Sequence, residues 1–453
     1  MSPIPSNPRV AILGGGLSGV AAAYSLARAG YRDITVVERG PELGGLAGSF
    51  ERAGHFYPLG YHHILDRDRT LLYFLDLIGA LPDVRWRKIR MLFRVGGRLY
   101  DLAHPVDFLR FPMSLADKAR FARLMLRTFG KTDWSDWLDR SGADLVDAWG
   151  SPGVRRAIFE PLARLKFQLS ASEVSGAWLG ARLHYREGSA PFGYIPNTTW
   201  TKVLCDGVTR LLTEQGVTIR TSTAVGSVET AGTRATAILL QSGERIPADV
   251  FVSSIPAEVY LKMVPREETP QLAAIRYSAL ISVVCATTQK IAPDFYWMNL
   301  ASLDRQACGC FLLSSLNPTI GGPGESCLNF VTHLQGRDRA LFQVGDDELL
   351  QGYLADFRAV FGFDLQPFWT RITRIPMYSP VLRVGYRNPP VRSATWENVY
   401  FAGNYRTFPS IVSTGTALAS GIEAADAILG DRGQSATLAT EVRSFRLRSM
   451  PRA

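Results

Sequence analysis

Three glycines near the N-terminus, Gly14, Gly16 and Gly19, have the spacing G-x-G-x-x-G and follow the apolar run Val10–Leu13. In a strand–turn–helix unit the first glycine permits a tight turn, the second lets the backbone approach a pyrophosphate, and the third lets the helix pack closely on the strand. Glu38 ends a second apolar run about 20 residues later, where a carboxylate accepts hydrogen bonds from ribose hydroxyls. This order predicts a dinucleotide site and disfavours a simple glycine-rich packing turn.

Two parallel strands and one helix must position these residues. The runs 10–13 and 34–37 are short and apolar, as buried parallel strands are. The segment from Ser18 to Ala29 is rich in Ala and Leu and stops at Gly30, which predicts a helix. The N–H groups and the dipole at its N-terminus favour a diphosphate.

The rest of the chain shows helical and strand patterns in alternation. A further short strand over Val399–Ala402 enters Gly403, and a helix follows from about Gly415 to Leu429. The other expected elements are helices over 70–79, 114–129, 136–149, 151–164, 202–215 and 347–361, a hairpin over 90–102, and strands over 217–219, 224–228, 237–241, 248–253 and 275–288.

Length and composition indicate a globular protein with room for two domains. The 453 residues are 46% hydrophobic and 20% charged. No apolar run reaches the ~18 residues of a spanning helix, and the N-terminus has no hydrophobic signal-peptide core, so we expect a cytoplasmic protein. Five cysteines are scattered, and the close pair Cys308 and Cys310 matches neither a C-x-x-C redox motif nor a zinc set. We expect buried free thiols and no metal site.

Positive charge is concentrated in residues 85–131. The whole chain has a net charge of +9, and this stretch alone holds twelve Lys or Arg against three Asp (12 − 3 = +9). Its basic residues alternate with apolar ones such as Phe108, Leu109, Leu124 and Phe129. That pattern suits a peripheral contact with the inner membrane face or an anionic substrate, and a solvated basic face is the alternative. No nucleic-acid-binding module accompanies the charge, so we expect no nucleic-acid partner.

Several further motifs carry a family resemblance. Gly44-Gly45 follows Glu38, TAVGSV surrounds Val225, GERIPADVFVSSIP spans 243–256, and YFAGN ends at Asn404. With the glycine motif, these segments resemble the FAD-dependent superfamily of protoporphyrinogen oxidases, phytoene-type desaturases, flavin amine oxidases and UDP-galactopyranose mutases. The similarity is greatest to the protoporphyrinogen-oxidase and desaturase branch, and it covers residues 1–80, 200–256 and 396–430 well.

The resemblance implies an α/β fold. It comprises a Rossmann-like FAD-binding domain of the glutathione-reductase type, assembled from residues 1–85, 200–260 and 391–435. Residues 86–199 and 261–390 would form an α+β substrate domain with a mixed sheet and a helical subdomain over 86–199. The resemblance further implies an FAD contacted by Gly14, Gly16, Leu17, Ser18, Gly19, Glu38, Arg39, Gly44, Gly45, Leu46, Gly60, Tyr61, His62, Val225, Gly403, Asn404, Gly415, Thr416 and Ala417.

Some positions depart from the family pattern. Leu46 stands where many members have Arg or Lys, and Asn404 stands where Asp or Glu is frequent. Ser282 aligns with the lysine that amine oxidases hold against flavin N5, and Ser413 with one wall of their aromatic cage, which argues against amine oxidation. No cysteine lies near 400–415, so we expect a non-covalent FAD. No second dinucleotide motif follows, so oxygen or a quinone would reoxidise the flavin.

Catalytic candidates come from the loop His62-His63-Ile64 and from two further positions, Tyr194 and Arg406. A histidine near a flavin orients a substrate or relays a proton. The alternative is that both imidazoles satisfy buried backbone groups. The expected substrate-pocket wall consists of Arg182, His184, Tyr185, Tyr194, Trp297, Tyr378 and Arg406.

The leading hypothesis is a dehydrogenase, desaturase or oxidase that transfers hydride from a small hydrophobic substrate, an isoprenoid or tetrapyrrole, to flavin N5. A non-redox mutase resembling UDP-galactopyranose mutase is a second hypothesis, favoured by the His62-His63-Ile64 element and the abundant arginine. An amine oxidase and a non-enzymatic flavoprotein complete the alternatives.

Overall fold

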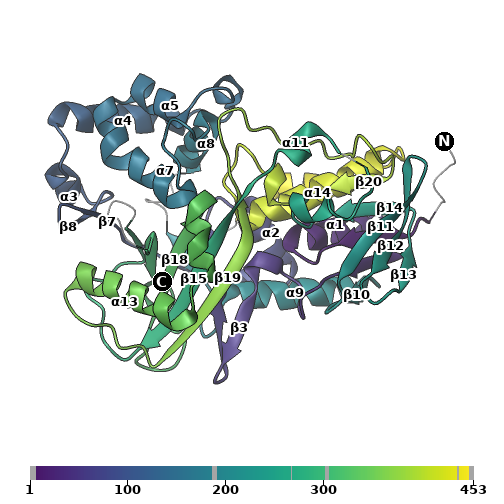
Figure 1. The fold of residues 1–453 in the computed structure, drawn as a ribbon, viewed down its shortest axis with the longest axis horizontal. Coiled ribbons are helices and arrows are strands. Elements are labelled where there is room, and N and C mark those ends of the chain that lie inside the picture. The colour runs from purple at the N-terminus through teal and green to yellow at the C-terminus, as the bar shows by residue number, and fades with distance from the viewer. Residues whose placement is uncertain (1–6, 186–190, 267, 301–305, 436–437, 448–453) are drawn as a thin grey trace.

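A five-stranded parallel sheet combines strands from the beginning, the middle and the end of the chain (Figure 1). The structure is a computed structural model that describes residues 7–185, 191–266, 268–300, 306–435 and 438–447. Apolar residues predominate in four of these strands and are buried there, whereas the edge strand Thr218–Arg220 is partly exposed. In spatial order the strands are β10 (Thr218–Arg220), β2 (Ile34–Val37), β1 (Val10–Leu13), β14 (Val250–Ser253) and β20 (Val399–Phe401).

Two different layers cover this sheet. One hydrophobic core packs the sheet against helices, and a second hydrophobic core packs it against a small antiparallel sheet. The helical layer contains α1 (Leu17–Arg28), α2 (Arg69–Leu77), α9 (Trp200–Glu214), α14 (Thr414–Gly430) and α15 (Leu438–Ser444). The opposite layer contains β11 (Val225–Ala231), β12 (Arg234–Leu240), β13 (Arg245–Pro247), α10 (Ala257–Tyr260) and α11 (Pro270–Ala273).

Helices α1 and α14 join the two ends of the chain (Figure 1). A Cβ atom at Gly421 of α14 would lie only 2.0 Å from the carbonyl oxygen of Ser18 in α1. The Ser18 hydroxyl also donates a 2.8 Å hydrogen bond to the carbonyl of Ala417. The glycine therefore allows an approach between the two helices that no larger residue permits.

A seven-stranded mixed sheet forms the base of the second lobe. Each pair of neighbouring strands in this sheet is antiparallel, except the pair β16 and β7, which is parallel. In spatial order the strands are β19 (Trp369–Pro380), β15 (Tyr277–Thr287), β18 (Ser326–Leu334), β17 (Gly309–Leu312), β16 (Trp297–Asn299), β7 (Met91–Val95) and β8 (Arg98–Asp101). In the chain, helix α12 (Leu313–Leu316) follows β17 and helix α13 (Asp346–Phe361) follows β18. Smaller sheets pair β3 (Ser49–Arg52) with β4 (His55–Pro58), and β9 (Phe192–Tyr194) with β5 (Ile64–Leu65) and β6 (Arg85–Arg87).

Short helices fill the rest of the second lobe and gather at the upper left of Figure 1. They are α3 (Pro105–Arg110), α4 (Leu115–Phe129), α5 (Gly142–Trp149), α6 (Pro152–Val154), α7 (Glu160–Phe167) and α8 (Gly176–Tyr185). The helix expected over 151–164 is confirmed as a continuous helical run over 152–167, which contains a π-helical turn at Arg155–Phe159 between α6 and α7. Pro161 lacks the N–H of a regular α-helical ladder. The helix expected over 136–149 begins only at Gly142, because Ser141 and Asp144 form a capping box there.

The arrangement confirms the predicted α/β fold with a discontinuous parallel sheet and a mixed second sheet. The expected hairpin over 90–102 is confirmed as β7 and β8. The five cysteines are all free and buried, as predicted. In the part of the chain that the structure describes, no helix is both long and apolar enough to span a membrane.

Candidate functional site

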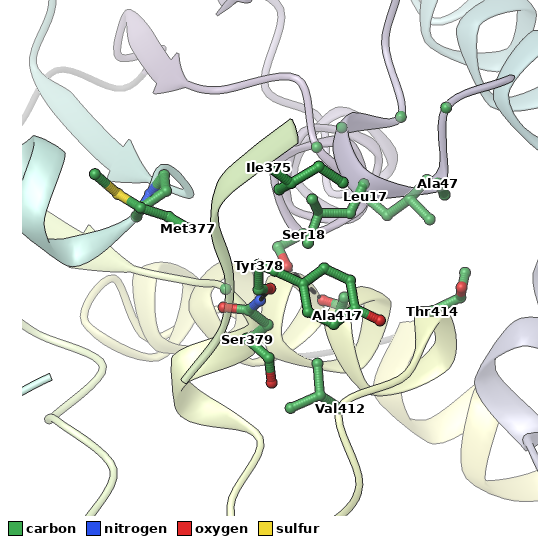
Figure 2. Close-up of a pocket in the computed structure, with 18 of the residues that line it drawn as sticks. Leu17, Ser18, Ala47, Ile375, Met377, Tyr378, Ser379, Val412, Thr414 and Ala417 are labelled. Atoms are coloured by element: carbon green, nitrogen blue, oxygen red, sulfur yellow. Dashed lines mark hydrogen bonds between the residues drawn. The ribbon is translucent and has the colours of Figure 1, made fainter. Parts of the chain in front are cut away.

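One cavity of about 940 Å³ runs between the parallel sheet and the mixed sheet. At one end it is bordered by the first turn of α1 and the loop that follows β2. Figure 2 shows Ser18 of α1 and Ala417 of α14 facing each other, and Tyr378 of β19 lines the same cavity. The cavity is large enough for an extended cofactor and part of a substrate.

The glycine turn at one end of the cavity fits a pyrophosphate. A Cβ atom at Gly16 would meet no atom within 4 Å, so backbone is open to the cavity there. Gly14 has φ +100°, and a Cβ at Gly19 would lie 2.1 Å from the Gly14 carbonyl oxygen. The positive φ at Gly14 and the close contact at Gly19 fit the predicted tight turn and close helix packing, and the open space at Gly16 leaves room for the approach to a pyrophosphate that the motif predicts.

Glu38 is fixed beside this turn by two backbone groups. Its carboxylate accepts hydrogen bonds from the N–H of Gly15 at 2.8 Å and of Gly40 at 2.7 Å. Each carboxylate oxygen has a second lone pair. The side chain lines the cavity, so its position is compatible with the ribose contact that the sequence predicts, which stays a prediction.

Asp68 is a site residue that the sequence reading missed. Its half-buried carboxylate accepts hydrogen bonds from the N–H of Gly415 at 3.2 Å and the hydroxyl of Ser413 at 3.3 Å, at the N-terminus of α14. It also caps α2 through the N–H of Leu71. Burial raises its pKa. The ionised form would offset the positive end of the α14 dipole. A helix-capping Asp before the run 70–79 was the available signal.

Most of the expected cofactor contacts line this cavity. They are Gly14, Gly16, Leu17, Ser18, Glu38, Arg39, Gly44, Gly45, Leu46, Tyr61, His62, Val225, Gly403, Asn404 and Ala417. Four others, Gly19, Gly60, Gly415 and Thr416, are not among the described lining residues. Thr416 instead forms a capping box with Ser413 at the start of α14.

The two histidines of the loop 59–64 are neutral at physiological pH. Burial lowers the pKa of His62 to about 4 and that of His63 to about 3. His62 Nε2 lies 3.0 Å from the carbonyl of Leu46, and because a carbonyl only accepts, Nε2 carries the proton. His63 stacks on Phe192 with ring centroids 4.0 Å apart. His62 therefore does satisfy a backbone group, as the structural alternative proposed, while both rings still line the cavity.

These shifts predict a loss of stability in mild acid. The unfolded imidazoles titrate near pH 6.5, so below that value the unfolded chain binds more protons than the folded chain. Stability is complete above about pH 6.5 and falls as the pH drops toward the folded pKa values. From pH 7.5 to 5.0 we expect a loss of roughly 1–2 kcal/mol for each imidazole. Urea unfolding of the double variant His62→Gln, His63→Phe should show a correspondingly smaller loss than the wild type, and identical pH profiles would contradict this assignment.

Two catalytic candidates lie away from this cavity. Arg406 is buried, and its guanidinium contacts Glu423 at 3.0 and 3.2 Å and the carbonyl of Pro389 at 3.1 Å. A buried guanidinium held by a carboxylate and backbone is a structural group, so we remove Arg406 from the catalytic candidates. Tyr194 lines a separate small pocket of about 30 Å³ together with His62.

The other end of the cavity has an aromatic wall with two cations. Of the expected wall residues, Arg182, Trp297 and Tyr378 line it. His184 is not among the described lining residues and lies 3.3 Å from the carbonyl of Thr128, while the side chain of Tyr185 lies outside the described residues. The sequence reading missed Lys166, Phe167 and Trp178. The scarcity of lysine in this chain was the one available signal for Lys166.

A glycine turn with open space at Gly16, a carboxylate fixed beside it and a cavity bordered by both ends of the chain fit a bound FAD. The model of the flavin containing amine oxidoreductase family matches residues 17–429. The chain therefore belongs to that family, it binds FAD, and it is a flavin-dependent oxidoreductase.

Curated relatives are similar over part of their length. A D-amino acid dehydrogenase of Methylobacterium radiotolerans is 28% identical over 54% of this chain and 60% of its own. A 4,4'-diapolycopene oxygenase of Methylomonas sp. is 24% identical over 55% of this chain and 56% of its own. The chain thus spans 60% or less of the length of these relatives.

Solved structures share the fold along nearly the whole chain. A provisionally named protoporphyrinogen oxidase from Exiguobacterium sp. 255-15 has a TM-score of 0.76 at 18% identity, covering 95% of this chain and 100% of that one. A reduced UDP-galactopyranose mutase has a TM-score of 0.75 at 17% identity, covering 97% and 100%. A putrescine oxidase with bound putrescine has a TM-score of 0.69 at 14% identity, covering 93% and 99%. These likenesses confirm the predicted superfamily fold.

Proposed function

We propose that this protein oxidises a small hydrophobic molecule whose reacting carbon lies over a non-covalently bound flavin. The observation that carries the proposal is the single cavity joining the glycine turn to the aromatic wall. The flavin, when bound, accepts a hydride from the substrate and passes the electrons to oxygen or a quinone. The residues of the chain hold the substrate, orient it and exclude water.

The wall residues suit that task. Tyr61 stacks on Phe311 with ring centroids 3.9 Å apart and an interplanar angle of 8°. Trp297 lies 5.4 Å from the same Phe311 ring, so the stack forms a rigid apolar surface. Such a surface positions an apolar substrate at little entropic cost and keeps the site dry. The names of the diapolycopene oxygenase and of the protoporphyrinogen oxidase support an isoprenoid or a tetrapyrrole as the substrate.

Neutral imidazoles are consistent with carbon–hydrogen oxidation. An uncharged His62 or His63 does not repel an apolar substrate, and Nδ1 of His62 is left as a proton acceptor by the bond from Nε2 to Leu46. We infer that His62 orients the loop 59–64 beside the flavin. We also infer that His63, beside the aromatic wall, contacts the substrate.

An anaerobic titration tests the proposal. The purified protein is mixed with polyprenoid, porphyrinogen, amine and nucleotide-sugar compounds, and the flavin absorbance is followed. We expect bleaching by a hydrophobic polyprenoid or porphyrinogen and recovery on admission of air or a quinone. Bleaching by an amine alone would overturn the proposal in favour of amine oxidation. Turnover of a nucleotide sugar that requires prior reduction and consumes no acceptor would indicate a mutase.

We also propose that α3 and α4 rest on an anionic membrane surface. Five of the seven large apolar side chains that are exposed among the described residues lie here: Val106, Leu109, Leu115, Leu126 and Phe129. Leu115, Ala119, Ala122, Leu126 and Phe129 follow one another at helical spacing along α4. We call these seven positions, with Arg110, Arg120 and Arg127 beside them, the α3–α4 surface. A basic rim around an apolar stripe fits anionic lipid headgroups and the acyl boundary beneath them.

Vesicle binding tests the α3–α4 surface. The triple variant Arg110→Glu, Arg120→Glu, Arg127→Glu is expected to lower binding to vesicles with 30% phosphatidylserine at least tenfold, because each basic residue near the surface contributes about 1 kcal/mol. Arg123 is left intact because it bonds to the carbonyl of Trp149 at 2.8 Å. Arg358→Glu on α13 is the matched control. Equal binding of the wild type to neutral vesicles, or no effect of the triple variant, would overturn the proposal.

A further inference from the structure

A buried tyrosine contacts one nitrogen of His63. His63 lines the main cavity, Tyr296 lines the small pocket of about 30 Å³, and Oη of Tyr296 lies 3.3 Å from Nδ1 of His63. The two rings are nearly perpendicular, at 87°, with centroids 5.8 Å apart. The backbone of Tyr296 is fixed because its N–H donates to the carbonyl of Arg90 and its carbonyl accepts from the N–H of Leu312, each at 2.9 Å. The phenol is therefore held against the imidazole.

The position of the imidazole proton follows from the hydrogen bonds of Tyr296. Its side chain is fully buried, and burial raises its pKa, so the hydroxyl stays protonated. Among the described residues, Nδ1 of His63 is the one hydrogen-bond partner of Oη. A buried hydroxyl that donates to no acceptor is unfavourable, so Oη donates to Nδ1. Nδ1 then carries no proton, and a neutral imidazole has its proton on Nε2.

His63 is neutral at physiological pH. Burial, with smaller contributions from His62, Arg182 and Lys166, lowers its pKa to about 3. The ring is therefore a hydrogen-bond donor at Nε2 and not an acid that gives up a proton. A neutral imidazole N–H can polarise a carbonyl group without adding a charge to the site.

Nε2 of His63 opens onto the main cavity. The ring stacks on Phe192 with centroids 4.0 Å apart, so one of its faces is covered. Within the described part of the chain Nε2 has no hydrogen-bond partner, and it is not one of the buried atoms that lack one, so it is accessible. Because the ring lines the main cavity, the N–H is offered to a ligand there. His62 differs, because its Nε2–H donates to the carbonyl of Leu46 at 3.0 Å.

We propose that Nε2 of His63 donates a hydrogen bond to a carbonyl oxygen of the substrate, and that Tyr296 is the positioning residue that fixes this donor. The inference deepens the proposed function and rests on it, because it takes the cavity beside the aromatic wall as the substrate site. A donor left without an acceptor is costly in a site of low polarity, so a substrate with a carbonyl is favoured over a hydrocarbon of the same shape. The substrate class is then an apolar skeleton that carries a carbonyl group.

Nitrogen NMR of the FAD-loaded protein with isotopically labelled histidines tests the tautomer. The chain has six histidines, and the signals of His63 are those absent from the variant His63→Phe. We expect the proton of His63 on Nε2 in the wild type and a mixture of both tautomers in Tyr296→Phe, where Nδ1 has lost its donor. A proton on Nδ1 in the wild type would overturn the inference, because Oη would then donate elsewhere, for example to water in the small pocket. A wild-type tautomer in folded Tyr296→Phe would overturn the role of Tyr296.

Equilibrium dialysis of the FAD-loaded protein with two naphthalene probes tests the donor. 2-Acetylnaphthalene has a carbonyl where 2-isopropenylnaphthalene has a carbon–carbon double bond of similar shape. The ketone is better hydrated, so a purely hydrophobic site binds the alkene at least as tightly. We expect the ketone to bind at least about threefold more tightly, the effect of one hydrogen bond, and His63→Phe to abolish this preference. His104→Phe, at an exposed histidine before α3, is the matched control and should retain it.

The comparison of the two probes on the wild type needs no variant, so misfolding of His63→Phe leaves the test intact. A smaller preference of the wild type for the ketone, or an unchanged preference in folded His63→Phe, would overturn the inference. A flavin that no hydrophobic compound bleaches would instead overturn the proposed function. Neither the tautomer nor the binding of the probes depends on turnover, which separates the two failures.

Discussion

Gly16→Val is expected to leave the fold intact and to lower the affinity for FAD about 100-fold or more, which corresponds to about 2.7 kcal/mol. The backbone at Gly16 has φ −64° and ψ 164°, an extended conformation that valine adopts without strain. A Cβ there meets no protein atom within 4 Å, so the added methyl groups enter the cavity. They would occupy the space through which the backbone approaches the pyrophosphate.

Fluorescence titration of the apoprotein with FAD measures this loss, and urea unfolding of the apoprotein checks the fold. We expect the free energy of unfolding to change by less than about 1 kcal/mol. Gly130→Val is the matched control, because Gly130 also has open space around its Cβ position but ends α4, away from the cavity. Wild-type FAD affinity in Gly16→Val would contradict the assignment of the glycine turn.

Gly421→Ala is expected to destabilise the protein by about 2–3 kcal/mol, the upper part of the range of about 1–3 kcal/mol found for overpacked interiors. The new methyl group would lie 2.0 Å from the Ser18 carbonyl oxygen and 3.0 Å from the Ala21 Cβ, so α1 and α14 must separate. Because Ser18 lines the cavity, the same change should weaken FAD binding about tenfold.

Gly430→Ala, on the same helix, is the control for this prediction. A Cβ at Gly430 meets nothing within 4 Å, so alanine there should be neutral or stabilise the helix by up to about 1 kcal/mol. Thermal unfolding with and without FAD compares the two variants. Equal melting temperatures of the two variants would show that the stability of the protein does not depend on the close crossing of α1 and α14 at Gly421.

The cofactor end of the site was predictable because its chemistry is local in sequence. Gly14, Gly16, Gly19 and Glu38 belong to one strand–turn–helix–strand unit, so their spacing alone fixes their relative positions. The C-terminal motif, in which Gly403 follows a short strand and precedes a helix rich in small residues, was predictable for the same reason. These positions depend on backbone geometry, which short motifs encode.

The substrate end was less predictable because its residues come from unrelated elements. Lys166 lies on α7, a helix whose start is set by a π-helical turn that periodicity did not reveal. Arg406 lies shortly after strand β20 in the sequence. Its guanidinium is nevertheless held inside the protein by the carboxylate of Glu423 on α14. Asp68 reaches Gly415 across 347 positions. Such contacts follow from tertiary packing, which no local pattern specifies.

The visible spectrum of the purified protein tests the central claim most directly, namely that the two ends of the chain together enclose FAD. We expect flavin absorbance in the folded protein, or its appearance after FAD is added to the apoprotein, and release of unmodified FAD on denaturation. A colourless protein that takes up no added FAD, while Gly16→Val and the wild type behave alike, would contradict the account.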